Sequence, residues 1–334
     1  MSMKGLIFMI WVGILGPKKY FGEALSKLVA GHRSAQVSTM MDLQELCDGM
    51  PYMSRGNEPG AGYWKMVNAV KKSDIIFNGL PGAMAEEVYS KALSSGKRII
   101  DIGDAYIGGS LEGRARSAYP GSVYGLSELY KDKMKDASIA ANPSSYCTGA
   151  ILGLAPLADA DLIDLDTVAI ESKSGITGLR RDDKLAEADI TVNNGVKIYR
   201  MESRDYTEEV NGQMLTLFDK KTSASYTSYI IPGMKGITTT IKADSHTGIS
   251  RHDISDVYRD FYKHNPFIEV CSGGGINKAR NRYKKCFCKI EASTDADYRE
   301  ITVTTVLDDA VRGAASQAIQ TMNLMYGIDG KIGL

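Results

Sequence analysis

A glycine-bearing turn near the N-terminus is the part of the chain best suited to hold a phosphate group. It runs from Gly13 to Gly22 and connects an apolar run, residues 6–15, to a segment with helical periodicity. Glycines let the backbone turn tightly and approach a pyrophosphate, whose charge is favoured at the N-terminus of the following helix. The alternative is a turn that serves geometry alone, because the spacing departs from G-x-G-x-x-G. The predicted dinucleotide contacts are Gly13, Gly16, Pro17, Lys18, Lys19, Tyr20, Phe21 and Gly22.

Asp42 is a candidate for binding the ribose of the same ligand. It lies twenty residues beyond Gly22, after a predicted second strand. A carboxylate at such a position accepts a hydrogen bond from a ribose hydroxyl, which would favour NAD over NADP. The alternative interpretation is a helix-capping or surface aspartate.

Cys147 is the cysteine whose surroundings could make it a nucleophile. We expect it in the first turn of a helix, where the positive end of the helix dipole lowers the pKa of a thiol. The alternative is a buried structural cysteine. The chain has five cysteines, an odd number without the spacing of a disulfide framework, which predicts free thiols in a reducing cytoplasm. Cys286 and Cys288 have strand spacing, so both thiols are expected on one face, and no metal site is predicted there.

The phosphate loop belongs to a segment in which predicted strands and helices alternate. The apolar run of residues 6–15 is typical of a parallel strand covered on both faces, and it is too short to span a bilayer. A helix is predicted over Ala83–Ser95, and further strands over Ala35–Met40, Asp74–Asn78 and Arg98–Ile102. This alternation predicts an α/β fold with a Rossmann-type, doubly wound parallel sheet.

Beyond residue 150 the strand-like segments are separated by long polar connections, which predicts a second α+β domain with a mixed or antiparallel sheet. The helical segment Ala310–Tyr326 has no strand after it, and we expect it to return to the first domain. The predicted domains are therefore residues 1–146 with 308–334, and residues 147–307. The strand-like segments are Thr167–Ser172, Ala224–Ile231, Thr238–Lys242, Cys286–Ala292 and Glu300–Leu307.

The composition limits the classes of partner. Forty basic and forty acidic residues give a formal net charge of zero, so the chain lacks the electrostatic footprint of a nucleic-acid-binding protein. Hydrophobic residues make up 43% of the chain and charged residues 24%, as in ordinary globular proteins, and 334 residues suffice for two cores. We expect a protein that acts on a small molecule, without nucleic-acid or membrane partners.

Several blocks along nearly the whole chain resemble N-acetyl-gamma-glutamyl-phosphate reductase, an enzyme family of arginine biosynthesis. The strongest block is Val306–Gly327, which is similar to the closing helix of that family. The resemblance implies a homo-oligomeric reductase that converts an acyl phosphate to a semialdehyde with NADP or NAD, through a cysteine thiolate and a thioester. The other blocks are Gly13–Gly22, Gly79–Gly82, Tyr124–Leu129, Asn142–Pro143, Thr148–Leu157, Ser172–Gly178 and Ile231–Ile237.

The resemblance also implies binding residues within these blocks. The glycine-containing turn after Ser172, together with nearby arginines, would hold an anion through backbone N–H groups and guanidinium, although such turns also occur for geometry alone. The implied cofactor contacts are Leu80, Pro81, Gly175 and Asp309. The implied substrate contacts are Asn142, Ser174, Thr177, Arg181, Tyr229 and Lys235.

Two catalytic positions of the family carry other residues here. Where the family has Asn-Pro-Gly-Cys-Tyr, this chain reads Asn-Pro-Ser-Ser-Tyr, so Ser145 stands at the nucleophile position. A serine hydroxyl is a far weaker nucleophile than a thiolate unless a base takes its proton, and the family's histidines are replaced in the segment that holds Arg204 and Tyr206. Cys147 lies two residues further on, which along a helix turns a side chain by about 200°. The candidate catalytic residues are Ser145, Cys147, Arg204 and Tyr206.

Three hypotheses follow for the function. The first is a reductase of the family type. The second is a dinucleotide-binding relative that has lost the chemistry and serves as a sensor or partner. The third is an enzyme that transfers hydride directly to a carbonyl or imine, with Tyr206 or Tyr229 as proton donor.

Overall fold

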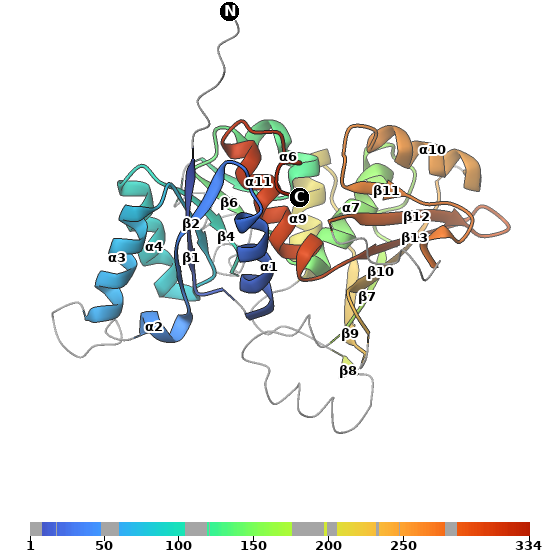
Figure 1. The fold of residues 1–334 in the computed structure, drawn as a ribbon. Helices are drawn as coiled ribbons and strands as arrows, with labels where there is room; N and C mark the ends of the chain where they lie inside the picture. Colours follow the sequence, from blue (N-terminus) through green and yellow to red (C-terminus); the bar gives the residue numbers. More distant parts are fainter. Residues whose placement is uncertain are drawn as a thin grey trace, which may run out of the picture. The chain divides into compact units, whose positions relative to one another are not determined.

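The computed structural model describes residues 9–17, 19–47, 60–103, 119, 121–175, 197–198, 206–231, 234–246, 248–277 and 286–334. The chain forms two compact units, both drawn in Figure 1. The first unit contains residues 1–109, 115–142 and 315–334, and the second contains residues 110–114 and 143–314. Each unit has its own β-sheet.

The first unit is built on a six-stranded parallel sheet with the strand order β2-β1-β3-β4-β6-β5. Its central strands, β1 (Ile10–Leu15) and β3 (Ile75–Asn78), consist almost entirely of buried residues, as expected of strands covered on both faces. The predicted doubly wound parallel sheet is thereby confirmed, although residues 6–8 of the predicted first strand lie outside the described residues. The other strands are β2 (Ala35–Met41), β4 (Arg98–Asp101), β5 (Ser122–Tyr124) and β6 (Ile139–Ala141).

Helices lie on both faces of this sheet (Figure 1). The C-terminal helix α11 (Ser316–Met325) packs on α6, α1 and β4, and its polar side chains are buried with internal partners. Gln320 donates a hydrogen bond of 3.0 Å to the Glu128 carboxylate, and the Thr321 and Ser127 hydroxyls lie 3.0 Å apart. The other helices are α1 (Lys19–Ala30), α2 (Leu43–Cys47), α3 (Ala61–Lys72), α4 (Gly82–Ser94) and α6 (Ser127–Met134).

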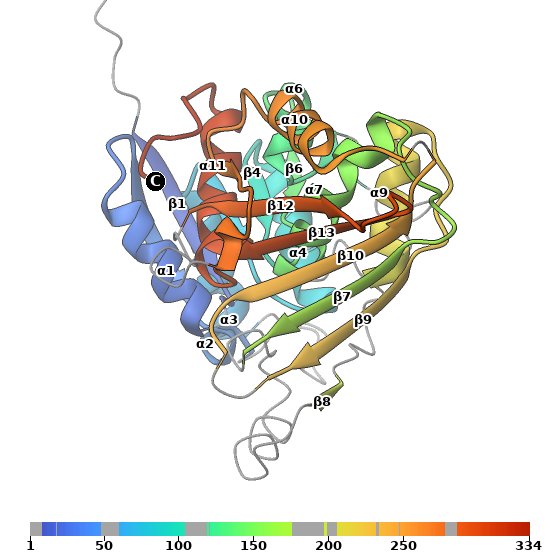
Figure 2. The ribbon, with the colours of Figure 1, turned by 90° about the vertical axis from the view of Figure 1, so that its right-hand side faces the viewer.

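The second unit contains a mixed seven-stranded sheet with the order β11-β12-β13-β10-β7-β9-β8. Buried and more exposed residues alternate along its strands, so one face lies against helices and the other is the face seen in Figure 2. β12 begins at Cys288, so the predicted strand start at Cys286 is wrong, and Cys286 precedes the strand. The strands are β7 (Ala169–Ser174), β8 (Lys197–Ile198), β9 (Ser225–Ile230), β10 (Ile237–Asp244), β11 (Ile268–Val270), β12 (Cys288–Thr294) and β13 (Glu300–Leu307).

The helix α7 (Ser145–Asp159) is buried along nearly its whole length and packs on β10 and β13. Two glycines allow this close approach, because a Cβ on Gly149 would lie 2.8 Å from Thr305 Oγ1 and one on Gly153 would lie 2.6 Å from Ile241 Cδ1. The remaining helices of the unit are α9 (Tyr206–Phe218) and α10 (Arg251–Phe261).

A proline inside α7 leaves one backbone carbonyl without its helical donor, and tyrosines of α10 and of the residue after it donate to this carbonyl and to the next one. Pro156 has no N–H for the carbonyl of Leu152, four residues earlier. The Tyr262 hydroxyl donates to that carbonyl at 2.6 Å, and the Tyr258 hydroxyl donates to the carbonyl of Gly153. These two tyrosines therefore fix the position of the helix that carries Ser145.

Candidate functional site

The turn after β1 lies at the point where the strand order of the first sheet reverses. β2 pairs on one side of β1 and β3 on the other, and ligands of doubly wound sheets bind outside the carboxyl ends of the strands at such a point. Gly16 has a φ of +60°, and a Cβ there would lie 2.5 Å from Leu80 Cδ2. A Cβ on Gly79 would lie 2.8 Å from the Gly16 carbonyl oxygen. The loops after β1 and β3 therefore touch with no side chain between their backbones.

Two helix N-termini follow these loops, α1 at Lys19 and α4 at Gly82. Neither helix has an acidic residue in its first turn, and no side chain caps α4 at Pro81. The partial positive charge of a helix N-terminus is then available to an anion. The residues of this edge thus fit the pyrophosphate of a dinucleotide.

Several of the predicted cofactor residues pack inside the first unit. Phe21 and Leu80 are core residues, 8% and 0% exposed, and Gly13 packs against Ser73 and Ile76. Gly22 lies against Pro17, since a Cβ on the glycine would be 3.0 Å from Pro17 Cγ. These residues shape the loop, and their contact with a dinucleotide stays a prediction. Lys18 lies outside the described residues, and Lys19 and Tyr20 begin α1.

Asp42 forms a reciprocal cap with Glu45 at the start of α2. Its Oδ1 accepts a hydrogen bond from the Glu45 N–H at 2.9 Å, and the Glu45 carboxylate accepts one from the Asp42 N–H at 2.9 Å. Such a capping box satisfies two N–H groups of the helix end. The Asp42 carboxylate therefore has a structural role in this cap. Asp42 is also exposed, and its contact with a ribose stays a prediction.

Replacing Asp42 by serine separates these two roles. Serine caps a helix about as well as aspartate but has no charge, so the free energy of unfolding should change by less than about 0.5 kcal/mol. If the carboxylate binds the ribose, the Kd for NAD should rise about tenfold while that for NADP changes less. Titration of intrinsic fluorescence with each dinucleotide measures both constants. Equal changes for the two ligands would refute the ribose contact.

The first turn of α7 carries two of the four candidate catalytic residues. Ser144 caps the helix, and its Oγ accepts a hydrogen bond from the Cys147 N–H at 3.2 Å. Ser145, the first helical residue, is half-buried, whereas Cys147 is 0% exposed. The serine and the cysteine therefore lie in different environments, as two residues along a helix require.

Tyr146, between these two, is the centre of an aromatic and hydroxyl cluster. Its ring stacks on Tyr206, with centroids 5.0 Å apart and planes inclined by 25°, and its hydroxyl lies 2.6 Å from Ser174 Oγ. The Tyr206 ring in turn lies 5.4 Å from that of Tyr226. The predicted residues Ser145, Cys147, Ser174 and Tyr206 thus come together around the start of α7.

The hydrogen bonds in a row of hydroxyl groups next to this cluster all run in one direction. The Tyr226 hydroxyl donates to the Tyr146 carbonyl at 3.1 Å, so it accepts from Ser172 Oγ at 2.6 Å, which accepts from Thr239 Oγ1 at 2.7 Å. Burial raises the pKa of Tyr226 well above its ordinary value, and the neighbouring Cys147 raises it further. Tyr226 therefore stays protonated and keeps donating to α7.

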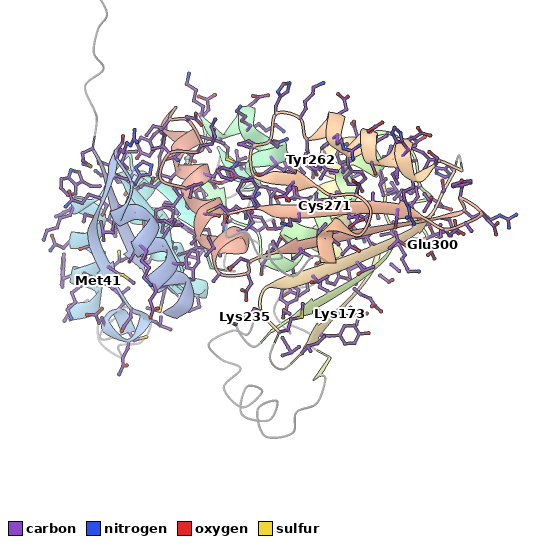
Figure 3. All side chains as sticks on the ribbon, turned by 45° about the vertical axis from the view of Figure 1, so that its right-hand side comes forward. Met41, Lys173, Lys235, Tyr262, Cys271 and Glu300 are labelled. Carbon is purple, nitrogen blue, oxygen red and sulfur yellow. The ribbon has the colours of Figure 1, made fainter. Side chains whose placement is uncertain are left out.

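The other predicted site residues are distributed over both units. Asn142 is 5% exposed, and its side-chain oxygen accepts a hydrogen bond of 3.2 Å from Gln317. Asp309 is 9% exposed and follows β13. Tyr229 is half-buried on β9 with Lys173 Nζ 6.0 Å from its ring centroid, and Lys235 is exposed ahead of β10 (Figure 3). Thr177, Arg181 and Arg204 lie outside the described residues.

Gly175 is the predicted residue with the tightest surroundings. A Cβ there would lie 1.8 Å from the Met234 carbonyl oxygen, so the chain after β7 passes directly against the backbone ahead of β10. Only glycine fits this approach.

Tyr146 and Tyr226 were not among the predicted site residues. Hydroxyls at alternate positions of β7, Ser172 and Ser174, are a signal in the sequence, because an inward strand face is normally apolar. Their partners on β9 and β10 depend on strand register, which the sequence pattern does not specify.

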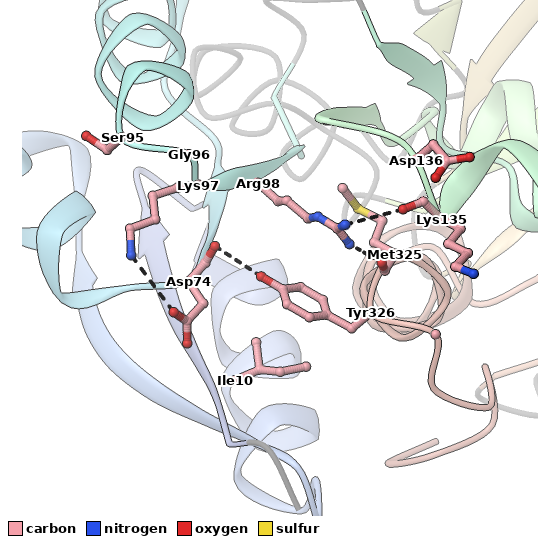
Figure 4. Close-up of a pocket in the computed structure, with 11 residues that line it drawn as sticks. Ile10, Asp74, Ser95, Gly96, Lys97, Arg98, Lys135, Asp136, Met325 and Tyr326 are labelled. Atoms are coloured by element: carbon pink, nitrogen blue, oxygen red, sulfur yellow. Dashed lines mark hydrogen bonds and ion pairs between the residues drawn. The ribbon is translucent and has the colours of Figure 1, made fainter.

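A cavity of 500 Å³ lies at the opposite edge of the first sheet, where β1 and β4 begin (Figure 4). The Arg98 guanidinium donates to the carbonyls of Met325 and Lys135, and the Tyr326 hydroxyl donates to the Asp74 carbonyl at 3.1 Å. Burial raises the pKa of Tyr326 to about 12, with Asp74 adding to the shift and Arg98 opposing it. These bonds tie helix ends to strand starts, so we assign the cavity a structural role.

The described part of the chain contains no group of three or more His, Cys, Asp or Glu side chains that could hold a metal ion. None of its helices is long and apolar enough to cross a membrane.

Comparison with known proteins places both units. Residues 11–137 match the family model described as semialdehyde dehydrogenase, NAD binding domain, and residues 145–309 match semialdehyde dehydrogenase, dimerisation domain. N-acetyl-gamma-glutamyl-phosphate reductase of Geobacillus stearothermophilus is 31% identical over 98% of each chain. That of Thermoanaerobacter sp. is 29% identical over the same shares. Aspartate semialdehyde dehydrogenase II of Vibrio cholerae has the same fold, with a TM-score of 0.67, 14% identity, and coverage of 96% of this chain and 98% of that one.

Proposed function

Because the chain belongs to the N-acetyl-gamma-glutamyl-phosphate reductase family, we propose that it is an NAD(P)-dependent oxidoreductase acting on the oxo group of a small substrate. The first unit binds the dinucleotide at the edge formed by Gly16 and Gly79, and the second binds the oxo group at the start of α7. We further propose that hydride passes directly to the carbonyl carbon, without a thioester. The natural substrate is then a carbonyl compound related to the semialdehyde of arginine biosynthesis.

The observation that carries this proposal is the contrast between Ser145 and Cys147. The family resemblance places Ser145 at the nucleophile position, and this serine is half-buried, whereas Cys147 is 0% exposed. A thiol without access to substrate cannot attack it, and a serine hydroxyl is a poor nucleophile unless a base takes its proton. A serine hydroxyl can still donate a hydrogen bond to an oxo group and stabilise charge that develops on its oxygen.

The steps assigned to this chain's residues are few. When bound, the nicotinamide supplies the hydride. Ser145 holds the substrate oxygen, and Tyr206, which packs on Tyr146 next to that serine, donates the proton that converts the oxygen to a hydroxyl. The carbonyl thus gains a hydride at carbon and a proton at oxygen.

Steady-state kinetics of four proteins test the proposal. We expect wild type and Cys147→Ala to oxidise NAD(P)H with a small aldehyde at rates within about twofold, since the thiol does not touch substrate. Ser145→Ala should lower kcat/KM about 100-fold, as loss of one donor to a developing oxyanion does. Tyr206→Phe should lower kcat, because the phenyl ring has no hydroxyl to donate the proton.

The same variants assayed for phosphate-dependent oxidation of N-acetylglutamate semialdehyde decide between the hypotheses. Activity that is lost only in Cys147→Ala would show the thioester route and refute the proposal. Tight dinucleotide binding without turnover of any carbonyl compound would instead show the non-catalytic relative.

We also propose that the protein is a cytoplasmic homo-oligomer. The match of residues 145–309 to a dimerisation domain supports assembly through the second unit, and five free cysteines suit a reducing compartment. Sedimentation velocity measures the mass in solution, and a monomer at micromolar concentration would contradict the assembly.

A further inference from the structure

A single π-helical turn, Val311–Ala315, precedes α11, and its residues 311–314 belong to the second unit. Asp308 caps this turn. Its carbonyl accepts a hydrogen bond from the Gly313 N–H at 2.8 Å, and its Oδ1 accepts from the N–H groups of Ala310 and Val311 at 3.1 and 2.9 Å. Turns of this kind are rare and are found frequently at functional sites.

Gly313, the middle residue of this turn, lies directly against Ser145. A Cβ on Gly313 would be 2.2 Å from Ser145 Cβ and 3.0 Å from Ser145 Cα. The same Cβ would lie 3.2 Å from Leu307 Cδ1, and Leu307 is 1% exposed, so the added methyl group would meet packed atoms of both Ser145 and Leu307.

Neighbouring groups hold the turn in place. Arg312 is fully buried, and its guanidinium lies 6.0 Å from the centroid of the Phe267 ring. A buried arginine over an aromatic face contributes packing as well as charge. The hydrogen bonds of Asp308 and the packing of Arg312 therefore fix where Gly313 lies, and Gly313 in turn limits where residue 145 can lie.

We propose that Gly313 is a positioning residue for the reacting centre, which it sets by close contact with Ser145. This rests on the proposed function, in which Ser145 touches the substrate. The Ser144 cap and the π-helical turn then act together, and both hold residue 145 at the N-terminus of α7.

A thiol introduced at position 145 reports on this positioning without any need for a substrate. In Ser145→Cys the new thiol lies at a helix N-terminus, which lowers its pKa and makes it alkylate faster at neutral pH. Peptide mapping after iodoacetamide treatment over a series of pH values gives the rate at position 145 alone. Adding Gly313→Ala should slow alkylation at pH 7 by about tenfold, because the added methyl group displaces the residue from the helix end.

Gly275→Ala is the matched control, since a Cβ there would meet only Cys271 Cβ, at an ordinary 3.6 Å. It should leave the pH profile of the Ser145→Cys thiol unchanged. A profile unaffected by Gly313→Ala would overturn the proposal, because general destabilisation does not alter the pKa of a thiol in the folded protein.

A stability cycle covers the case in which Gly313→Ala folds poorly. The loss in melting temperature caused by Gly313→Ala should be largely recovered in Ser145→Gly/Gly313→Ala, which removes the Cβ that the new methyl group meets. Failure to recover would show that the contact is not the cause. Both readouts are independent of turnover, so they remain decisive even if the proposed reaction is refuted.

Discussion

Gly16→Ala is expected to abolish dinucleotide binding. The alanine would have to adopt a φ of +60°, which costs an L-residue about 1–2 kcal/mol, and its Cβ would lie 2.5 Å from Leu80 Cδ2. The Leu80 backbone nitrogen, 3.2 Å from the same point, prevents the loop after β3 from absorbing the change by side-chain rotation alone. The two loops must separate, which moves the N–H groups of α1 and α4 away from the pyrophosphate. We expect the Kd for both NAD and NADP to rise at least about 100-fold.

Isothermal titration with each dinucleotide measures this effect, and Gly31→Ala is the control. A Cβ on Gly31 would meet the Lys27 and Leu28 carbonyl oxygens at an ordinary 3.7 Å. The control should bind as wild type does. Unchanged affinity in Gly16→Ala would mean that the dinucleotide does not bind at this edge of the sheet.

Gly175→Ala is expected to be the most damaging single substitution in the second unit. Its Cβ would lie 1.8 Å from the Met234 carbonyl oxygen and 2.7 Å from the Met234 carbonyl carbon, and a backbone carbonyl cannot rotate away as a side chain can. Either β7 or the segment ahead of β10 must shift, at a cost of about 3 kcal/mol in the free energy of unfolding. The shift would also move Ser174, whose hydroxyl lies 2.6 Å from that of Tyr146. We therefore expect kcat to fall more than dinucleotide affinity.

Urea denaturation and dinucleotide titration of the same variant separate these effects. Ser174→Ala removes the hydroxyl without moving the backbone, so it should reproduce the loss in kcat with a smaller loss in stability. A Gly175→Ala protein as stable as wild type would show that the close approach to Met234 is not a constraint on the fold.

The parallel sheet of the first unit was predictable because its central strands are buried on both faces. The strands β1 and β3 consist almost entirely of apolar residues without alternation, a pattern that few other structures produce. The start of β12 was not predictable in the same way. Cys286 continues the alternation of the strand in sequence, but strand pairing to β11 and β13 begins only at Cys288.

The hydroxyl cluster under α7 shows why a site built across strands is hidden in the sequence. Ser172 is paired with Ser228 on one side and with Thr239 on the other, and Thr239 is paired with Thr305. These four residues form one buried row only because of the register of four strands, and a shift of one residue would turn any of them to the other face. Within α7, by contrast, the different environments of Ser145 and Cys147 follow from helical geometry alone.

In the proposed reaction hydride reaches the carbonyl carbon without a covalent acyl-enzyme, and intact-protein mass spectrometry measures whether such an adduct forms. The protein is incubated with N-acetylglutamyl phosphate in the absence of reduced dinucleotide, quenched in acid, and weighed before and after treatment with hydroxylamine. We expect an unchanged mass and, in a peptide map, unmodified Cys147 and Ser145. A stoichiometric acyl adduct on Cys147 or Ser145 that hydroxylamine removes would contradict it.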